Sequence, residues 1–145
     1  MGKVLVKARI ENVKDLYSVK LGLIRADRVR AVEVEDAVVD SGAVVLSMPS
    51  RLIAQLGLDS AKWHSRHTRA FEIAKLTIQG RDCVTTVLEL PDDSPVLIGS
   101  TSCLAMDWVV DPKTNTLGGN PAHGGEWMVE AWSPILLEPE PQQGA

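Results

Sequence analysis

The sequence predicts a single, mainly β domain with two short helices. Apolar and polar side chains alternate near the N-terminus, β-branched residues concentrate in short runs, and turn-forming residues separate those runs. A chain of 145 residues can also bury one core without disulfides or metal. We therefore expect one all-β domain over residues 1–137.

The composition is that of a moderately acidic globular protein. Apolar residues make up 45% of the chain and charged residues 23%, and the formal net charge is −4. The basic residues form no stripe, so neither nucleic acid nor a membrane is expected as a partner. The N-terminal MGKVLVKARI holds no long apolar stretch and no cleavage site, which favours a cytoplasmic protein.

The first half of the chain predicts three strands and a helix. Residues 3–10 alternate in the manner of a half-buried strand. The stretch RVRAVEVEDAVVD, residues 28–40, changes from alternating at 32–35 to continuously apolar at 37–39, as in a strand that runs into the core. Residues 44–46 begin a second β-branched run and are expected to form a strand. A short helix follows, which Pro49 opens and Gly57 ends. Its inward-facing residues are expected to be Leu52, Ile53 and Leu56.

The second half predicts a hairpin, a helix and a strand pair. Residues 71–78 and 83–90 flank a tight turn at Gly80. After VLIG, the segment STSCLAM predicts a helix that Ser100 or Thr101 caps. DWVVDPKTNTL then predicts strand, turn and strand, and EWMVEAWSPILL one last strand. Residues 138–145, rich in Pro and Glu, are expected to be a disordered tail.

Asp40 stands between two apolar runs in AVVDSGAVVL, which is an expensive position for a carboxylate. The charge must be neutralised, paired or hydrogen-bonded there. Gly42 permits a sharp turn and the close approach of another backbone. If a second copy of the chain faces this loop across a two-fold axis, Asp40 meets Asp40, and two carboxylates at close range share one proton. One is then an acid and the other a base, as the hydrolysis of a peptide bond requires.

The stretch AVVDSGAVVLSMPSRLIAQLGL resembles the catalytic loop and following helix of retropepsin-like (clan AA) aspartic proteases of the bacterial and archaeal single-domain type. The matching loop residues are Asp40, Ser41, Gly42 and Ala43. The later VLIG resembles the second signature of that family, with Leu97, Ile98 and Gly99 before a short helix. The likeness covers most of residues 3–123.

The resemblance implies a retropepsin-like acid-protease barrel with one lobe per chain, which acts as a homodimer on a peptide or protein substrate and needs no cofactor. Asp40 is then the catalytic acid, and Ser41 bonds across the loop pair. A flap is expected within residues 60–75, with Trp63, His64 and His67 as candidates. Viral members carry an arginine after the second-signature glycine that braces the dimer. This chain has Ser100 there, so we expect its C-terminal strands to secure the dimer.

Two other chemistries receive less support from the sequence. A zinc site would need His64 and His67 to lie on a helix that the local pattern does not favour, together with His123 and either Cys83 or Cys103. No metal is therefore expected. Ser41 as a nucleophile lacks the preceding glycine of a nucleophile elbow.

Three function classes follow, and the favoured one is a homodimeric aspartic endopeptidase. The alternative is a catalytically inactive dimeric module of the same fold that binds peptides or supports assembly. A monomeric ligand-binding β domain is the third class, and in it Asp40 would need an internal cationic partner.

Overall fold

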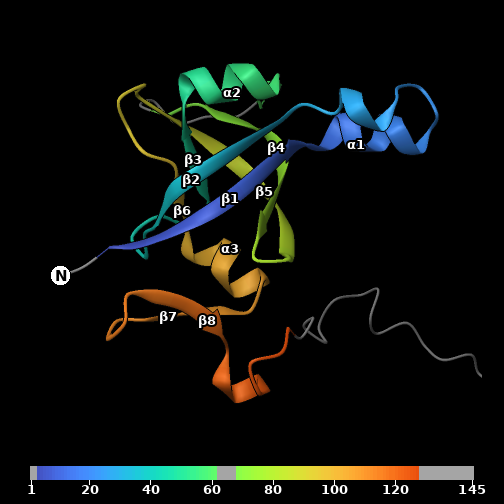
Figure 1. Ribbon diagram of the computed structural model, residues 1–145. Coiled ribbons are helices and arrows are strands. Elements are labelled where there is room, and N and C mark those ends of the chain that lie inside the picture. Colours follow the sequence, from blue (N-terminus) through green and yellow to red (C-terminus); the bar gives the residue numbers. More distant parts are fainter. Residues whose placement is uncertain (1–2, 62–67, 128–145) are drawn as a thin grey trace, which may run out of the picture.

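The computed structural model describes residues 3–61 and 68–127, and its centre is a closed barrel of six strands (Figure 1). The order around the barrel is β1-β2-β6-β3-β5-β4. These strands are β1 (Val4–Asn12), β2 (Ala31–Val39), β3 (Leu46–Pro49), β4 (Ala70–Ile78), β5 (Arg81–Leu90) and β6 (Leu97–Ile98). The predicted mainly β class is confirmed.

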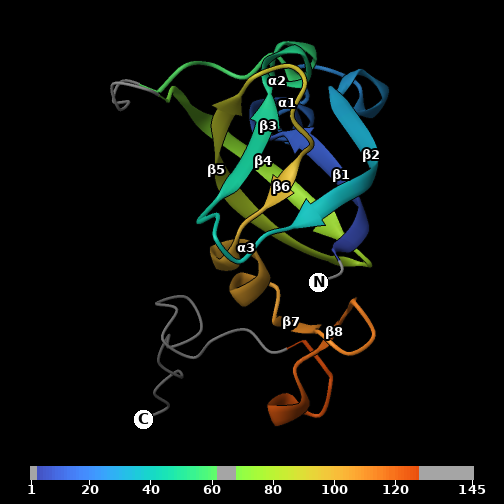
Figure 2. The ribbon, with the colours of Figure 1, turned by 90° about the vertical axis from the view of Figure 1, so that its left-hand side faces the viewer.

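A second, two-stranded sheet is formed by β7 (Trp108–Asp111) and β8 (Thr116–Gly119). This β7–β8 hairpin lies beyond α3 (Ser100–Ala105) at one end of the barrel, whereas α1 (Val13–Lys20) and α2 (Ser50–Leu56) lie at the other end (Figures 1 and 2). Short 3-10 turns cover Ala26–Arg28 and Pro121–His123. The predicted strand-turn-strand after the second short helix is confirmed.

The alternation in β1 sends every second side chain into the barrel. Val4, Val6, Ala8 and Ile10 are buried and the residues between them are exposed. They pack with apolar residues from every other barrel strand, among them Val32, Ala37, Leu46, Met48, Leu76, Ile78, Val87 and Ile98. Burial of this continuous core is the main stabilising term of the domain.

The turn chemistry expected in the middle of the chain is present. Gln79 and Gly80 have φ values of 50° and 84°, the left-handed pair that a two-residue hairpin between β4 and β5 requires. Pro49 stands at the N-cap of α2, and Gly57 ends that helix with φ 65°. Of the residues expected to face inward, Ile53 and Leu56 are buried and Leu52 is half-buried.

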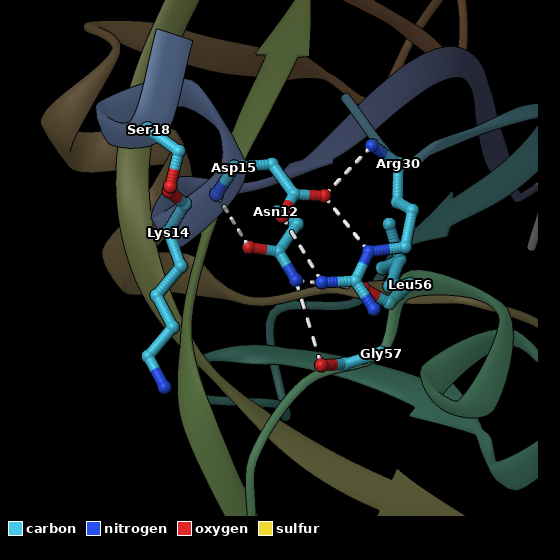
Figure 3. Close-up of polar contacts among 7 residues, drawn as sticks. All are labelled: Asn12, Lys14, Asp15, Ser18, Arg30, Leu56 and Gly57. Atoms are coloured by element: carbon cyan, nitrogen blue, oxygen red, sulfur yellow. Dashed lines mark hydrogen bonds and ion pairs between the residues drawn. The ribbon is translucent and has the colours of Figure 1, made fainter. Parts of the chain in front are cut away.

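The described residues form three α-helices, whereas the sequence predicted two, and the additional helix is α1. The Asn12 side chain caps this helix by accepting the Asp15 N–H at 3.0 Å and donates to the Leu56 carbonyl at 2.7 Å (Figure 3). Asp15 in turn accepts two bonds from the Arg30 guanidinium, at 2.8 and 3.0 Å. The signal for α1 was Asn12 with an acid three residues on, which resembles a capping box.

One predicted strand is displaced in the structure, and several predictions for the C-terminal part lie outside the described residues. The β-branched run expected as a strand at 44–46 is displaced, since β3 begins at Leu46. The expected strand at residues 126–137, the domain boundary at 137 and the tail at 138–145 lie outside the described residues, except for Glu126 and Trp127, which are not in a strand. Each helix in the described ranges is too short to cross a lipid bilayer.

Candidate functional site

Asp40 directly follows β2 and lies beside the end of β6. The two strands run parallel, with Val38 opposite Leu97 and Val39 opposite Ile98. The Asp40 N–H donates to the Ile98 carbonyl at 3.0 Å. The structure thus brings the two predicted signatures together, although they lie more than fifty residues apart in the chain.

The loop after Asp40 is a tight turn that holds its carboxylate. The Gly42 N–H donates to Asp40 Oδ1 at 2.8 Å, and the Ala43 N–H donates to the Asp40 carbonyl at 3.0 Å. A Cβ at position 42 would lie 3.2 Å from the same Oδ1. Glycine therefore lets the backbone come close to the carboxylate and donate to it.

Gly99 allows the second signature to touch the backbone of the Asp40 loop. A Cβ at position 99 would lie 2.4 Å from the Val44 carbonyl carbon and 2.6 Å from the Val45 nitrogen. No side chain fits there, so this contact explains the glycine of the VLIG motif.

The start of α3 is hydrogen-bonded to the same loop. Ser100 and Thr101 donate their N–H groups to the carbonyls of Ala43 and Val44, at 3.0 and 3.1 Å. Their hydroxyls donate to the same two carbonyls instead of capping the helix, so the capping prediction for these residues was wrong. The carbonyls of Ala43 and Val44 are thus bonded to α3, and β3 begins after them, at Leu46.

Two adjoining cavities meet at Asp40, between the barrel and the β7–β8 hairpin. The larger has a volume of about 670 Å³ and the smaller about 250 Å³. Val39, Asp40, Ser41 and Val110 line both of them. The remaining walls are mostly apolar and include Val4, Val38, Pro112, Cys103, Leu104, Trp108 and Val109. The hairpin residues were not anticipated as part of the site, because only the fold brings them opposite Asp40.

Asp40 is half-buried, and no ion pair between described side chains includes it. Among the described residues it is also the sole acid that lines the two cavities. Lys3, which is exposed, lines the larger cavity as well but forms no ion pair with Asp40, so the described side chains do not provide the paired internal cation that a monomeric ligand-binding domain would need.

Of the residues in the zinc alternative, His64 and His67 lie outside the described residues, and His123, Cys83 and Cys103 lie within them. His123 Nδ1 is hydrogen-bonded to Asp107 Oδ2, at a distance of 2.6 Å. Cys83 and Cys103 are free thiols, and burial raises the pKa of both, that of Cys83 to about 11. Within residues 3–61 and 68–127 no three His, Cys, Asp or Glu side chains gather as metal ligands would.

The three flap candidates, Trp63, His64 and His67, lie outside the described residues. The segments on either side of them are paired: the Ala61 N–H donates to the Ala70 carbonyl at 2.9 Å, and the Glu72 N–H donates to the Asp59 carbonyl at 2.8 Å. Ser60 and Phe71 form an antiparallel bridge.

No protein-family model matches the chain, and no curated protein matches it either. Among solved structures, the chain is similar to the crystal structure of the retroviral protease-like domain of Ddi1 from Leishmania major. The identity is 19%, the match covers 79% of this chain and 86% of that one, and the TM-score is 0.46.

Proposed function

We propose that the chain is a homodimeric aspartic endopeptidase in which Asp40 side chains from two copies activate one water molecule. The observation that carries this proposal is the joined pair of signatures. The Asp40 loop is hydrogen-bonded to Ile98 and to the start of α3, and it presents to an open, mostly apolar groove a half-buried carboxylate that forms no ion pair with any described side chain.

A second acid is needed because one carboxylate cannot be both the base that deprotonates water and the acid that protonates the leaving amine. Asp40 is the one acid that the described residues of this chain contribute to the groove. A two-fold axis through the loop brings a second Asp40 opposite the first, and the pair then holds one proton between them.

The surface around Asp40 suits such a second copy. Val44, Leu104 and Val109 leave 65%, 76% and 42% of their area exposed, and they come from the Asp40 loop, α3 and β7. In a C2 dimer the same surface of each copy faces the other. The apolar patches of the two copies would therefore cover each other and both would be removed from water. Because Ser100 replaces the bracing arginine of viral members, the β7–β8 hairpin is our candidate for securing the dimer.

In the proposed reaction the ionised Asp40 takes a proton from water as the water oxygen bonds to the peptide carbonyl carbon. Asp40 of the second copy, which is protonated, donates its proton to the carbonyl oxygen. The tetrahedral intermediate then returns a hydroxyl proton to a carboxylate, and the C–N bond breaks as the amine nitrogen takes the proton of the other carboxyl. Neither a metal nor a covalent enzyme intermediate takes part.

Asp40→Asn is the direct test, with Asp36→Asn as its control. Asp36 is an exposed acid on β2, the strand that ends just before Asp40, and it lies outside both cavities. We expect Asp40→Asn to keep the fold and the dimer but to lower cleavage of a denatured protein by on the order of 10²–10⁴-fold. Cleavage is followed by mass spectrometry and association by sedimentation velocity.

The same experiment decides between the protease and its rivals. If wild type and Asp40→Asn are dimeric and equally inert from acid to neutral pH, the inactive peptide-binding or assembly module is the better account. If the wild type is a monomer at all concentrations, the shared-proton mechanism fails.

A further inference from the structure

Arg81 opens β5 immediately after the Gln79–Gly80 turn and reaches from the barrel to the chain around the β7–β8 hairpin. Its Nη1 donates to the carbonyls of Met106 and Asp107 at 3.1 and 2.9 Å, and its Nη2 donates to the Gly125 carbonyl at 2.6 Å. The guanidinium carbon lies 3.9 Å from the centre of the Trp108 ring. The half-buried Arg81 side chain is therefore held both by hydrogen bonds and by cation–π stacking on Trp108.

The carbonyls that Arg81 binds belong to both ends of the hairpin. Met106 and Asp107 connect α3 to β7, and Gly125 follows β8. The two ends are also tied to each other, because Asn120 donates its N–H to the Asp107 carbonyl at 3.2 Å and its Nδ2 to Asp107 Oδ1 at 3.1 Å. Arg81 thus joins a closed unit, residues 106–125, to a barrel strand.

This connection is important because the hairpin sheet is separate from the barrel sheet. The position of the hairpin determines the wall opposite Asp40, where Val110 lines both cavities and Pro112 lines the larger. It also determines the position of the exposed Val109.

We propose that Arg81 is a positioning residue, which holds the β7–β8 hairpin against the barrel and thereby preforms the Asp40 groove and the surface for a second copy. The part of this proposal that concerns the second copy rests on the proposed function. Arg81 touches no reacting atom and acts through the hairpin.

The test is Arg81→Lys, which keeps the charge but loses the planar fork and most of the stacking. Arg9→Lys is the control, since Arg9 also pairs through its guanidinium, with Glu33, but on the outside of β1. Hydrogen exchange read by mass spectrometry reports on residues 106–125 and, separately, on the barrel strand at 70–78. Sedimentation equilibrium gives the dimer dissociation constant.

We expect Arg81→Lys to raise the hydrogen-exchange rate of residues 106–125 at least about tenfold, while the rate of residues 70–78 is unchanged. The dimer dissociation constant should rise by a similar factor, because one or two charged hydrogen bonds are lost. Cleavage activity should then recover at high protein concentration. Unchanged exchange in 106–125 would overturn the proposal, and so would an equal rise in both regions, because that is general destabilisation. The exchange result stands even if Asp40→Asn shows that the chain is no protease.

Discussion

Gly99 is the residue on which the contact between the two signatures depends. The Gly99 Cα lies so close to the Val44 backbone that there is no room for a methyl group. A Cβ at position 99 would lie 2.4 Å from the Val44 carbonyl carbon. Backbone atoms cannot rotate away as a flexible side chain can. The Asp40 loop or α3 would have to move instead.

Gly99→Ala is therefore expected to lower the free energy of unfolding by about 1–3 kcal/mol, the usual cost of overpacking, and to reduce cleavage further by displacing Asp40. Urea denaturation measures the first effect. Gly118→Ala is the matched control, because a Cβ there meets nothing within 4 Å and the φ of Gly118 is not left-handed. Equal stability of the two variants would contradict the contact.

The two thiols give a second prediction at this scale. Burial raises the pKa of Cys83 to about 11 and that of Cys103 above its ordinary value, so both are protonated at neutral pH. We expect iodoacetamide to label the native protein far more slowly than the urea-unfolded protein, as measured by mass spectrometry. Rapid native labelling of Cys103, which lines the smaller cavity, would show that this cavity wall opens.

At the scale of elements, α1 depends on a small polar cluster for its attachment to the barrel (Figure 3). Asp15 accepts from the Arg30 guanidinium and also from the Arg30 N–H at 2.9 Å, while Asn12 links the helix start to α2. The Arg30 hydrogen bond is the main reason that the pKa of the Asp15 carboxyl is lowered. The ionised form is thus the one that holds the helix.

Asp15→Asn is expected to lower the free energy of unfolding by about 1–3 kcal/mol at neutral pH, because a charged hydrogen-bonded pair is lost. A lowered folded-state pKa means that this contribution is complete above the unfolded-state pKa of about 3.9 and disappears as pH falls through the folded-state value. The wild-type and variant curves should therefore converge in acid. Asp27→Asn, at an exposed pair with Arg25, is the control and should change little.

At the scale of the whole molecule, two strongly exposed leucines belong to segments at opposite ends of the barrel. Leu104 is 76% exposed and belongs to α3, where it lines the smaller cavity with Asp40. Leu23 is 71% exposed and follows α1, which lies at the other end of the barrel (Figure 1). In the proposed dimer only Leu104 lies at the two-fold contact. Because the two leucines are similarly exposed, the same substitution at each of them tests whether this contact forms.

Leu104→Glu is expected to yield a monomer without cleavage activity at concentrations where the wild type is a dimer, because the introduced charge would be buried against its own copy. Leu23→Glu should leave both association and cleavage unchanged. Sedimentation velocity and a peptide-cleavage assay decide. If Leu104→Glu dimerises as the wild type does, the proposed surface is wrong.

Much of the fold could be predicted because its causes are local. The alternation in β1, the left-handed pair at Gln79–Gly80 and the Pro49–Gly57 limits of α2 each reflect the conformational preferences of a few adjacent residues. The capping role of Ser100 and Thr101 was predicted wrongly for the opposite reason. Their hydroxyls bind the carbonyls of Ala43 and Val44, which are close only in the folded chain.

The sequence by itself determined a mainly β domain, the loop that carries Asp40 and the second motif that ends in Gly99. Those features follow from periodicity and from residue types that only certain backbones accept. Only the tertiary structure decided that the loop and the motif are bonded backbone to backbone, that the β7–β8 hairpin walls the groove, and that Arg81 holds it there. Contacts between distant segments depend on how the barrel closes, and no local pattern in the chain encodes that geometry.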